Sequence, residues 1–200
     1  MKYLWILDAG HGGMIDGVYQ TKGKRSPKWP DGRQLFEGEF NRDVVQRIAA
    51  LCESNCIDYH ILVPEQEDIS LGERVRRANA LHKEHKCIYV SIHANAGGGT
   101  GWEVFTSPGD TKADPIATIF AEKAAACFPD FRMRKDLSDD DPDKEASFYV
   151  LKHTQMPAIL TENFFMDRLS PDCELLFSDS GRQQIAQMHC DAISTIEANL

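Results

Sequence analysis

The stretch Tyr3–Gly13, YLWILDAGHGG, begins as a run of apolar residues and ends in three glycines around one histidine. A short apolar run that stops at glycines is typical of a buried strand and the loop that follows it. The stretch Cys87–Gly99, CIYVSIHANAGGG, has the same form, and Cys87–His93 is predicted to be a second buried strand. Strands that are apolar along their whole length are buried on both faces of a sheet. The two stretches therefore predict a sheet with both faces covered.

Helical patterns separate these strands. Residues 39–52 and 71–83 carry apolar residues at helical spacing, and the second segment begins with the capping box Ser70-Leu71-Gly72-Glu73. We expect this second helix to bury Leu71, Val75, Ala78 and Leu81. The remaining predicted elements are strands at 58–63, 102–106, 147–151 and 158–162, a helix from Asp114-Pro115 to 127, and a helix opened by a capping box of Ser180 and Gln183 that runs to 198.

The alternation of strands and helices predicts the fold class. It indicates an α/β protein with a mostly parallel (mixed) twisted sheet of about six strands and helices on both faces. The chain has 200 residues, and we find no internal repeat and no break in composition. We therefore expect residues 1–200 to form a single domain.

Composition and charge exclude several classes of protein. The chain is 42% hydrophobic and 26% charged, which is close to an ordinary globular protein. Its formal net charge of −9 argues against binding to nucleic acid, because phosphate neutralisation needs a basic face. The chain contains no run of about 18 apolar residues, which is the length that a membrane-spanning helix needs. The six cysteines lack a CxxC spacing, and we expect reduced thiols.

Polar residues stand where three of the predicted strands end. His11, His93 and Glu162 each follow an apolar run. Ligands of open α/β sheets bind beyond the carboxyl ends of the strands. Two histidines and a carboxylate that converge there are typical of a catalytic zinc site with a position left open for water. Taken singly, each histidine is more often an ordinary hydrogen-bonded loop residue, so this pattern alone indicates no function.

Five motifs follow one another along the chain. They are Asp8-Ala9-Gly10-His11-Gly12-Gly13, Glu37 with Asn41, Leu71…Arg74…Ala78-Asn79, Ser91-Ile92-His93-Ala94-Asn95-Ala96, and Pro157-Ala158-Ile159-Leu160-Thr161-Glu162. In this order the chain resembles the zinc-dependent N-acetylmuramoyl-L-alanine amidases, which hydrolyse bacterial cell-wall peptidoglycan. The resemblance covers nearly the whole chain, from Leu7 to the last helix. It implies that residues 1–200 are a single zinc amidase catalytic domain.

The resemblance also implies a role for individual residues. His11, Glu37 and His93 match the family's three Zn²⁺ ligands, and Glu162 matches its catalytic glutamate, which is not a ligand. Glu39 lies two residues after Glu37 and stays open as the middle ligand, because helix starts are imprecise in a sequence. Asn95 follows a ligand closely and has two candidate roles: contact with the substrate, or support of the glycine turn after it.

The chemistry that the resemblance implies is hydrolysis of an amide. Zinc lowers the pKa of bound water to about 7, and Glu162 would take that proton and return it to the leaving amine. In the family, the bond cut joins the lactyl group of N-acetylmuramic acid to the L-alanine of the stem peptide. The expected binding partner is peptidoglycan or a muropeptide as substrate. We expect the protein to be a monomer. The alternative is a zinc peptidase or amidohydrolase that acts on soluble peptides.

Two segments have opposite charge. Residues 12–36 carry five basic and two acidic side chains, whereas residues 136–145 carry six carboxylates and one lysine. The basic segment either borders the substrate groove and meets carboxylates of the substrate, with Trp29 stacking on sugar or peptide, or folds as an exposed loop. The acidic segment lacks the glycine spacing of an EF-hand, so we expect a solvated loop near the groove.

The amino-terminal residues give an expectation about location. Only six apolar residues precede Asp8, which are too few for the core of a signal peptide. We expect no signal peptide and synthesis in the cytoplasm, although the implied substrate lies in the cell wall. The route of export stays open, as does the choice between a host autolysin and a phage endolysin.

Overall fold

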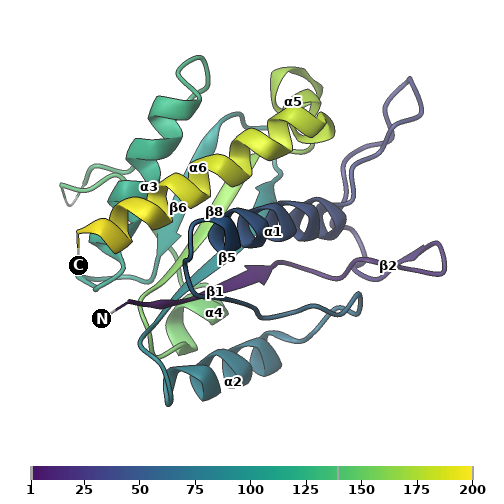
Figure 1. Cartoon of the computed structure of the whole chain (residues 1–200). Coiled ribbons are helices and arrows are strands. Elements are labelled where there is room, and N and C mark those ends of the chain that lie inside the picture. Colours follow the sequence, from purple (N-terminus) through teal and green to yellow (C-terminus); the bar gives the residue numbers. More distant parts are fainter. Residues whose placement is uncertain (1, 139, 200) are drawn as a thin grey trace.

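The computed structural model describes residues 2–138 and 140–199. Figure 1 shows a central sheet with helices on both of its faces. In chain order the elements are β1 (Leu4–Ala9), β2 (Met14–Ile15), β3 (Val18–Tyr19), α1 (Glu37–Ser54), β4 (Tyr59–Ile61), α2 (Leu71–His82), β5 (Cys87–Asn95), β6 (Trp102–Thr106), α3 (Asp114–Cys127), β7 (Lys144–Glu145), α4 (Tyr149–His153), β8 (Ala158–Phe165), a π-helical turn (Leu169–Cys173), α5 (Glu174–Phe177) and α6 (Asp179–Ala198).

The sheet has six strands in the order β4-β1-β5-β8-β6-β7. All neighbouring pairs are parallel except β6 and β8, which are antiparallel. The predicted mixed sheet of about six strands is therefore confirmed. Because β1, β5 and β8 are adjacent and parallel, their carboxyl ends lie at the same edge of the sheet. This arrangement brings the residues after β1 close to His93 and Glu162, which are partners in the β5–β8 register.

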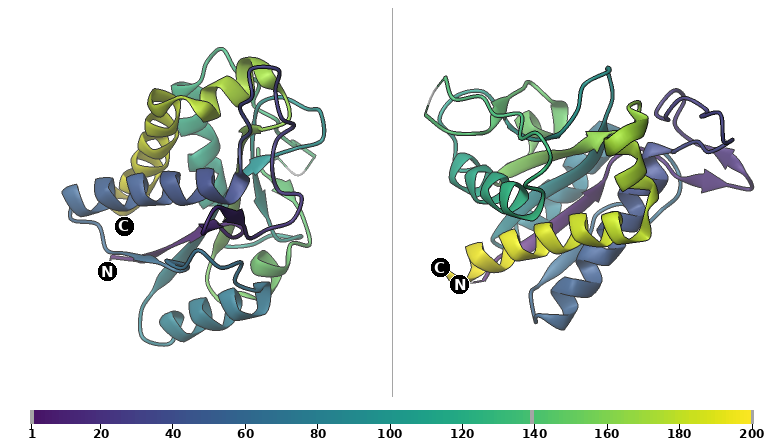
Figure 2. Two further views of the ribbon diagram at one scale, coloured as in Figure 1. Left: turned by 90° about the vertical axis from the view of Figure 1, so that its right-hand side faces the viewer. Right: turned by 90° about the horizontal axis from the view of Figure 1, so that it is seen from above.

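Alternation along the strands divides the core between the two faces of the sheet. In β1, Trp5 and Leu7 belong to the larger hydrophobic cluster, with residues of α1, α3 and α6, whereas Ile6 belongs to the smaller cluster, with residues of α2 and α4. Successive side chains of a strand point to opposite faces, so α1, α3 and α6 cover one face and α2 and α4 cover the other. Figures 1 and 2 show these layers.

Both ends of the described chain lie on one side of the molecule (Figure 2). The Tyr3 amide and the Trp5 indole nitrogen donate hydrogen bonds to the carboxylate of Glu197 in α6, at 3.1 and 2.9 Å. This is the edge where β1 begins, and it is opposite the edge where β1, β5 and β8 end. Among the described residues, none of the helices combines the length and the apolar character that a membrane crossing requires.

Helix starts agree only in part with the capping predictions. Ser70 accepts a hydrogen bond from the Glu73 amide at 3.3 Å, as predicted, but the Glu73 side chain pairs with Arg76 and Arg77. The predicted capping box of Ser180 and Gln183 is wrong. Ser178 caps α6 instead and accepts a hydrogen bond from the Gly181 amide at 3.0 Å.

Two further predictions are wrong. Residues 147–151 do not form a strand, because Tyr149–His153 is the short helix α4, which buries Val150 and Leu151 in the smaller cluster. A short apolar run suits a buried helical turn as well as it suits a strand. Leu71 is not buried by α2. It is the first residue of the helix, and its side chain is 53% exposed.

The hairpin of β2 and β3 is not among the predicted elements. Met14 pairs with Tyr19, and the two central residues Asp16 and Gly17 have φ angles of 49° and 78°. Positive φ at both positions is the geometry of a type I′ turn, for which Asp-Gly is a preferred sequence. The signal was therefore present in the sequence.

Candidate metal centre and active site

Two histidines and a glutamate from three separate segments converge at the carboxyl edge of the sheet. Glu37 is the first residue of α1 and is buried. Its Oε1 atom lies 3.1 Å from Nε2 of His11 and 3.0 Å from Nδ1 of His93. One ligand atom from each side chain lies within 4.8 Å of the other two. The structure thus brings together the three residues that the sequence predicts as ligands.

The donor set fits a zinc ion. Tetrahedral ligands about 2 Å from a metal lie about 3.3 Å apart, close to the two separations at Glu37 Oε1. Nε2 of His11 is buried and makes no well-formed hydrogen bond among the described residues, although it lies 3.1 Å from the Glu37 carboxylate. A buried nitrogen with no partner is costly unless another group binds it. Two imidazole nitrogens and a carboxylate oxygen are ligands that zinc prefers.

The three side chains perturb one another's proton affinity. Burial opposes ionisation of Glu37, but the imidazoles of His11 and His93, both close to its Oε1 atom, outweigh it and lower the pKa of the carboxyl below its usual range. Burial also opposes a charged His93, yet the carboxylate of Glu37 outweighs this effect and raises the pKa of the imidazole. Glu37 is therefore held as a carboxylate, the form in which it can bind a cation.

Glu39 lies elsewhere. Its Oε1 atom would be 2.6 Å from a Cβ placed on Gly13, and its side chain lines a separate cavity with Arg42 and Gln46. Two residues of an α-helix differ by about 200° around the axis, so Glu37 and Glu39 cannot face the histidines together. Of the two candidates, Glu37 is the one that lies with the histidines, and its role as a ligand stays a prediction.

Glu162 stands beside His93 on the neighbouring strand. Its Oε2 atom is buried and makes no hydrogen bond within the described residues. Burial, supported by the negative charges of Glu37 and Glu103, raises the pKa of Glu162 to about 7, although His93 and Lys24 oppose the shift. A carboxyl group with a pKa near neutrality is suited to accept a proton and to return it.

A cavity of about 460 Å³ opens above these groups. His11, His93 and Glu162 line one part of it. Lys24 and Asp68 line another part, and the apolar side chains Leu71, Phe148 and Tyr149 are also in the wall. The two candidate histidine ligands and the carboxyl of Glu162 are thus accessible to a ligand in one cavity, while Glu37 lies buried behind the histidines.

Comparison with known proteins assigns the family. Residues 6–195 match the model of a family described as N-acetylmuramoyl-L-alanine amidase. The chain belongs to this amidase family. It is 30% identical over 189 residues to N-acetylmuramoyl-L-alanine amidase CwlM of Bacillus licheniformis. This alignment covers 94% of this chain and 66% of that protein. The chain is 30% identical over 200 residues to the endolysin of Bacillus phage SPP1, covering 98% of this chain and 66% of that protein.

The chain therefore spans 66% of the length of each of these two relatives. A solved structure supports the fold. The amidase Ami1 from Mycobacterium smegmatis superposes with a TM-score of 0.78 at 22% identity, covering 99% of this chain and 98% of that chain. At this identity the similarity establishes the fold alone.

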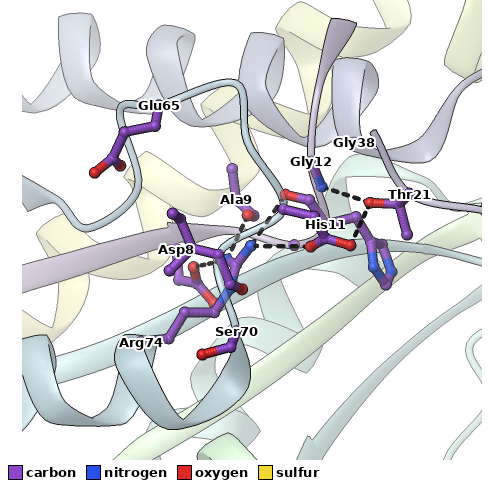
Figure 3. Close-up of polar contacts among 12 residues, drawn as sticks. Asp8, Ala9, His11, Gly12, Thr21, Gly38, Glu65, Ser70 and Arg74 are labelled. Atoms are coloured by element: carbon purple, nitrogen blue, oxygen red, sulfur yellow. Dashed lines mark hydrogen bonds and ion pairs between the residues drawn. The ribbon is translucent and has the colours of Figure 1, made fainter. Parts of the chain in front are cut away.

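In this amidase-family chain, two buried arginines hold the loop that carries His11. Figure 3 shows one of them, Arg74, beside this loop. His11 has a φ of 67°, a left-handed conformation that is uncommon for a residue with a side chain. Its carbonyl oxygen accepts hydrogen bonds from Arg42 at 2.9 Å and from Arg74 at 3.0 Å. Arg74 also pairs with the buried carboxylate of Asp8, which in turn accepts a hydrogen bond from the Tyr89 hydroxyl at 2.6 Å.

This network was not predicted from the sequence as a functional feature. Arg74 belongs to one of the recognised motifs, but the sequence does not show what it contacts. The one visible signal is Asp8, a charged residue at the end of an apolar strand, which requires a partner if it is buried. Gly10 is also part of the site, because a Cβ at this position would overlap the imidazole of His93.

Asn95 lies outside the lining of the cavity. Its Nδ2 donates to Glu103 at 2.5 Å, and its Oδ1 accepts from the Ala96 amide at 2.8 Å. Both ends of the amide are therefore engaged within the protein. These contacts favour support of the turn over contact with the substrate, which stays a prediction.

The basic segment 12–36 contributes one residue to the cavity. Lys24 lines it, so the segment reaches the cavity at this residue, and contact with carboxylates of the substrate stays a prediction. The prediction for Trp29 is wrong, because its side chain packs against the larger hydrophobic cluster and does not line the cavity. In the acidic segment, Asp143 is buried and accepts a hydrogen bond from the Thr106 hydroxyl at 2.6 Å.

Proposed function

We propose that the chain is a zinc-dependent hydrolase that cleaves the amide bond between the lactyl group of N-acetylmuramic acid and the L-alanine of the peptidoglycan stem peptide. One observation carries the proposal: His11, Glu37 and His93 converge into one candidate metal site, and the two histidines line the same cavity as the carboxyl of Glu162. Membership of the amidase family supports the choice of bond. The proposed substrate places the site of action in the cell wall.

The protein's own residues would hold the ion. His11 Nε2, Glu37 Oε1 and His93 Nδ1 are the candidate ligand atoms. When bound, zinc supplies a Lewis acid that activates water and polarises the scissile carbonyl. The hydrogen bonds from Arg42 and Arg74 fix the backbone of His11 and thereby the direction of its imidazole. Outer contacts of this kind orient ligands and tune their affinity for the metal.

Glu162 would carry the proton. Its carboxylate takes a proton from the attacking water as the oxygen bonds to the carbonyl carbon of the lactyl group. The same carboxyl then donates the proton to the nitrogen of L-alanine as the carbon–nitrogen bond breaks. The products are a free lactyl carboxylate and a peptide with a new amino terminus. A pKa raised to about 7 suits both steps, because neither protonation state is strongly disfavoured near neutral pH.

Purified cell-wall sacculi provide the test. Zinc-loaded protein is expected to release soluble peptides that begin with L-alanine, identified by mass spectrometry. Glu162→Gln should abolish this release while leaving the bound zinc unchanged. His85→Gln is the matched control, because His85 is exposed and lies near Tyr3 and Lys86, at the opposite edge of the sheet.

Two results would contradict the proposal. Release of sugar fragments without free stem peptides would assign a different bond. Cleavage of soluble muropeptides or peptides, with intact sacculi left untouched, would favour the alternative of a zinc amidohydrolase that acts on soluble substrates.

A further inference from the structure

Lys24 is anchored next to a candidate metal ligand. Its carbonyl oxygen accepts a hydrogen bond from the amide of Glu37 at 3.0 Å. Beyond it, Arg25 and Phe36 form a β-bridge, and the Ser26 amide donates to the carbonyl of Leu35 at 2.8 Å. These bonds fasten the middle of the basic segment to its own end and to the start of α1. The backbone of Lys24 is therefore fixed relative to the metal centre.

Lys24 also supplies a positive charge that has no direct partner among the described residues. Over residues 2–138 and 140–199, its ammonium group forms no ion pair and no hydrogen bond, although it lines the cavity. Arg74 is the other cationic side chain in the wall, but its guanidinium is occupied by Asp8, by the carbonyl of Ala9 and by that of His11. Lys24 is thus the lining cation with donors left for a ligand.

The cavity wall includes an apolar surface. Leu71, Phe148 and Tyr149 line the cavity and are 53%, 38% and 44% exposed. They are three of the five large hydrophobic side chains that are exposed in the described part of the chain. Exposed apolar residues gathered at one place mark a binding surface. The cavity therefore suits a ligand with an anionic group near the reacting bond and an aliphatic portion.

We propose that Lys24 binds a carboxylate on the peptide portion of the substrate, at the residue that follows L-alanine, and so makes the chain select carboxylate over carboxamide forms of that residue. The inference rests on the proposed amidase function. Lys24 and Glu162 line the same cavity, so an acidic residue directly after L-alanine would bring its carboxylate towards this cation. A partly exposed ion pair of this kind is worth about a fivefold preference.

Two synthetic muramoyl dipeptides test the inference. They differ only in whether the residue after L-alanine carries a carboxylate or a carboxamide. The wild-type protein is expected to show about a fivefold higher kcat/KM for the carboxylate, mainly through KM, and the preference should shrink as salt is added. Lys24→Met should remove the preference, and Lys24→Glu should reverse it.

Control measurements separate selection from other effects. Lys22→Met is the matched control, because Lys22 is exposed in the same segment and does not line the cavity, so this variant should keep the wild-type preference. Bound zinc should be equal in all variants. An unchanged ratio in Lys24→Met would overturn the inference. An equal fall in kcat for both substrates would also overturn it and assign Lys24 to the scissile amide. The proposed function itself fails on a separate result, which is that the wild-type protein releases no peptide beginning with L-alanine from sacculi.

Discussion

The carbonyl oxygen of His11 accepts a hydrogen bond from Nη2 of Arg74 at 3.0 Å, which joins α2 to the loop that carries a candidate metal ligand. The same guanidinium neutralises Asp8, a buried carboxylate at the end of β1. One side chain therefore links the stability of the fold to the geometry of the metal site.

Substitution of Arg74 should separate these two effects. Arg74→Lys keeps a positive charge near Asp8 but cannot reproduce the planar fork, so zinc affinity should fall about tenfold or more with a smaller loss of stability. Arg74→Met leaves Asp8 unpaired and should destabilise the fold by about 3–5 kcal/mol. Zinc competition titration and urea unfolding measure the two quantities. Unchanged zinc affinity in a folded Arg74→Lys variant would contradict the role in positioning His11.

The choice of Glu37 as a ligand predicts different outcomes for two neighbouring glutamates. Glu37→Gln should weaken zinc binding by about two orders of magnitude, because a charged ligand is lost, whereas Glu39→Gln should bind zinc as the wild type does. Isothermal titration with zinc checks both variants. Loss of zinc in Glu39→Gln alone would reverse the assignment.

Gly10 and Gly72 offer a second matched pair. Gly10→Ala should displace the His93 imidazole, because the added methyl group overlaps it, and should lower both zinc affinity and activity. Gly72→Ala lies in the first turn of α2, where the Tyr149 hydroxyl, the nearest side-chain atom, is 4.0 Å from the new Cβ. It should be neutral or stabilise the protein by up to about 1 kcal/mol. Thermal unfolding and zinc titration of both variants test this difference.

The raised pKa of Asp143 should make the free energy of unfolding depend on pH. Burial is the main cause that raises its pKa to about 7, with a contribution from Asp141, while the Thr106 hydroxyl opposes the shift. The folded state holds this proton more tightly than the unfolded state, so stability from this group is present below about pH 4 and is lost as the pH rises to about 7. Asp143→Asn should therefore gain about 4 kcal/mol relative to the wild type between pH 4 and pH 8. Urea unfolding at both pH values measures this change, and a constant difference would refute it.

Much of the site follows from local sequence. His11, His93 and Glu162 each end an apolar run, and parallel strands place such ends at one edge, so the amino-acid sequence alone is enough to predict their proximity. The choice between Glu37 and Glu39 could not be made in this way, because it depends on where α1 begins. A helix that starts at Glu37 turns Glu39 about 200° away from the histidines.

Other features depend on contacts between distant segments. The sequence does not show what Arg74 and Trp29 contact. Tertiary packing brings Arg74 to the carbonyl of His11 and Trp29 against the larger hydrophobic cluster. Residues 147–151 failed as a predicted strand because five residues are too few to distinguish a buried helical turn from a buried strand. By contrast, Asp16-Gly17 carried a sufficient local signal for the β2–β3 hairpin.

The hydrogen bonds from Tyr3 and Trp5 to Glu197 determine where a segment attached to either end would lie relative to the cavity. They hold the first strand and the last helix together at the edge remote from the cavity. A fusion or affinity tag attached at either terminus would therefore emerge behind the catalytic face. The cavity would then stay accessible to a large cross-linked polymer. Immobilisation of the protein through either end should likewise preserve its access to insoluble substrate.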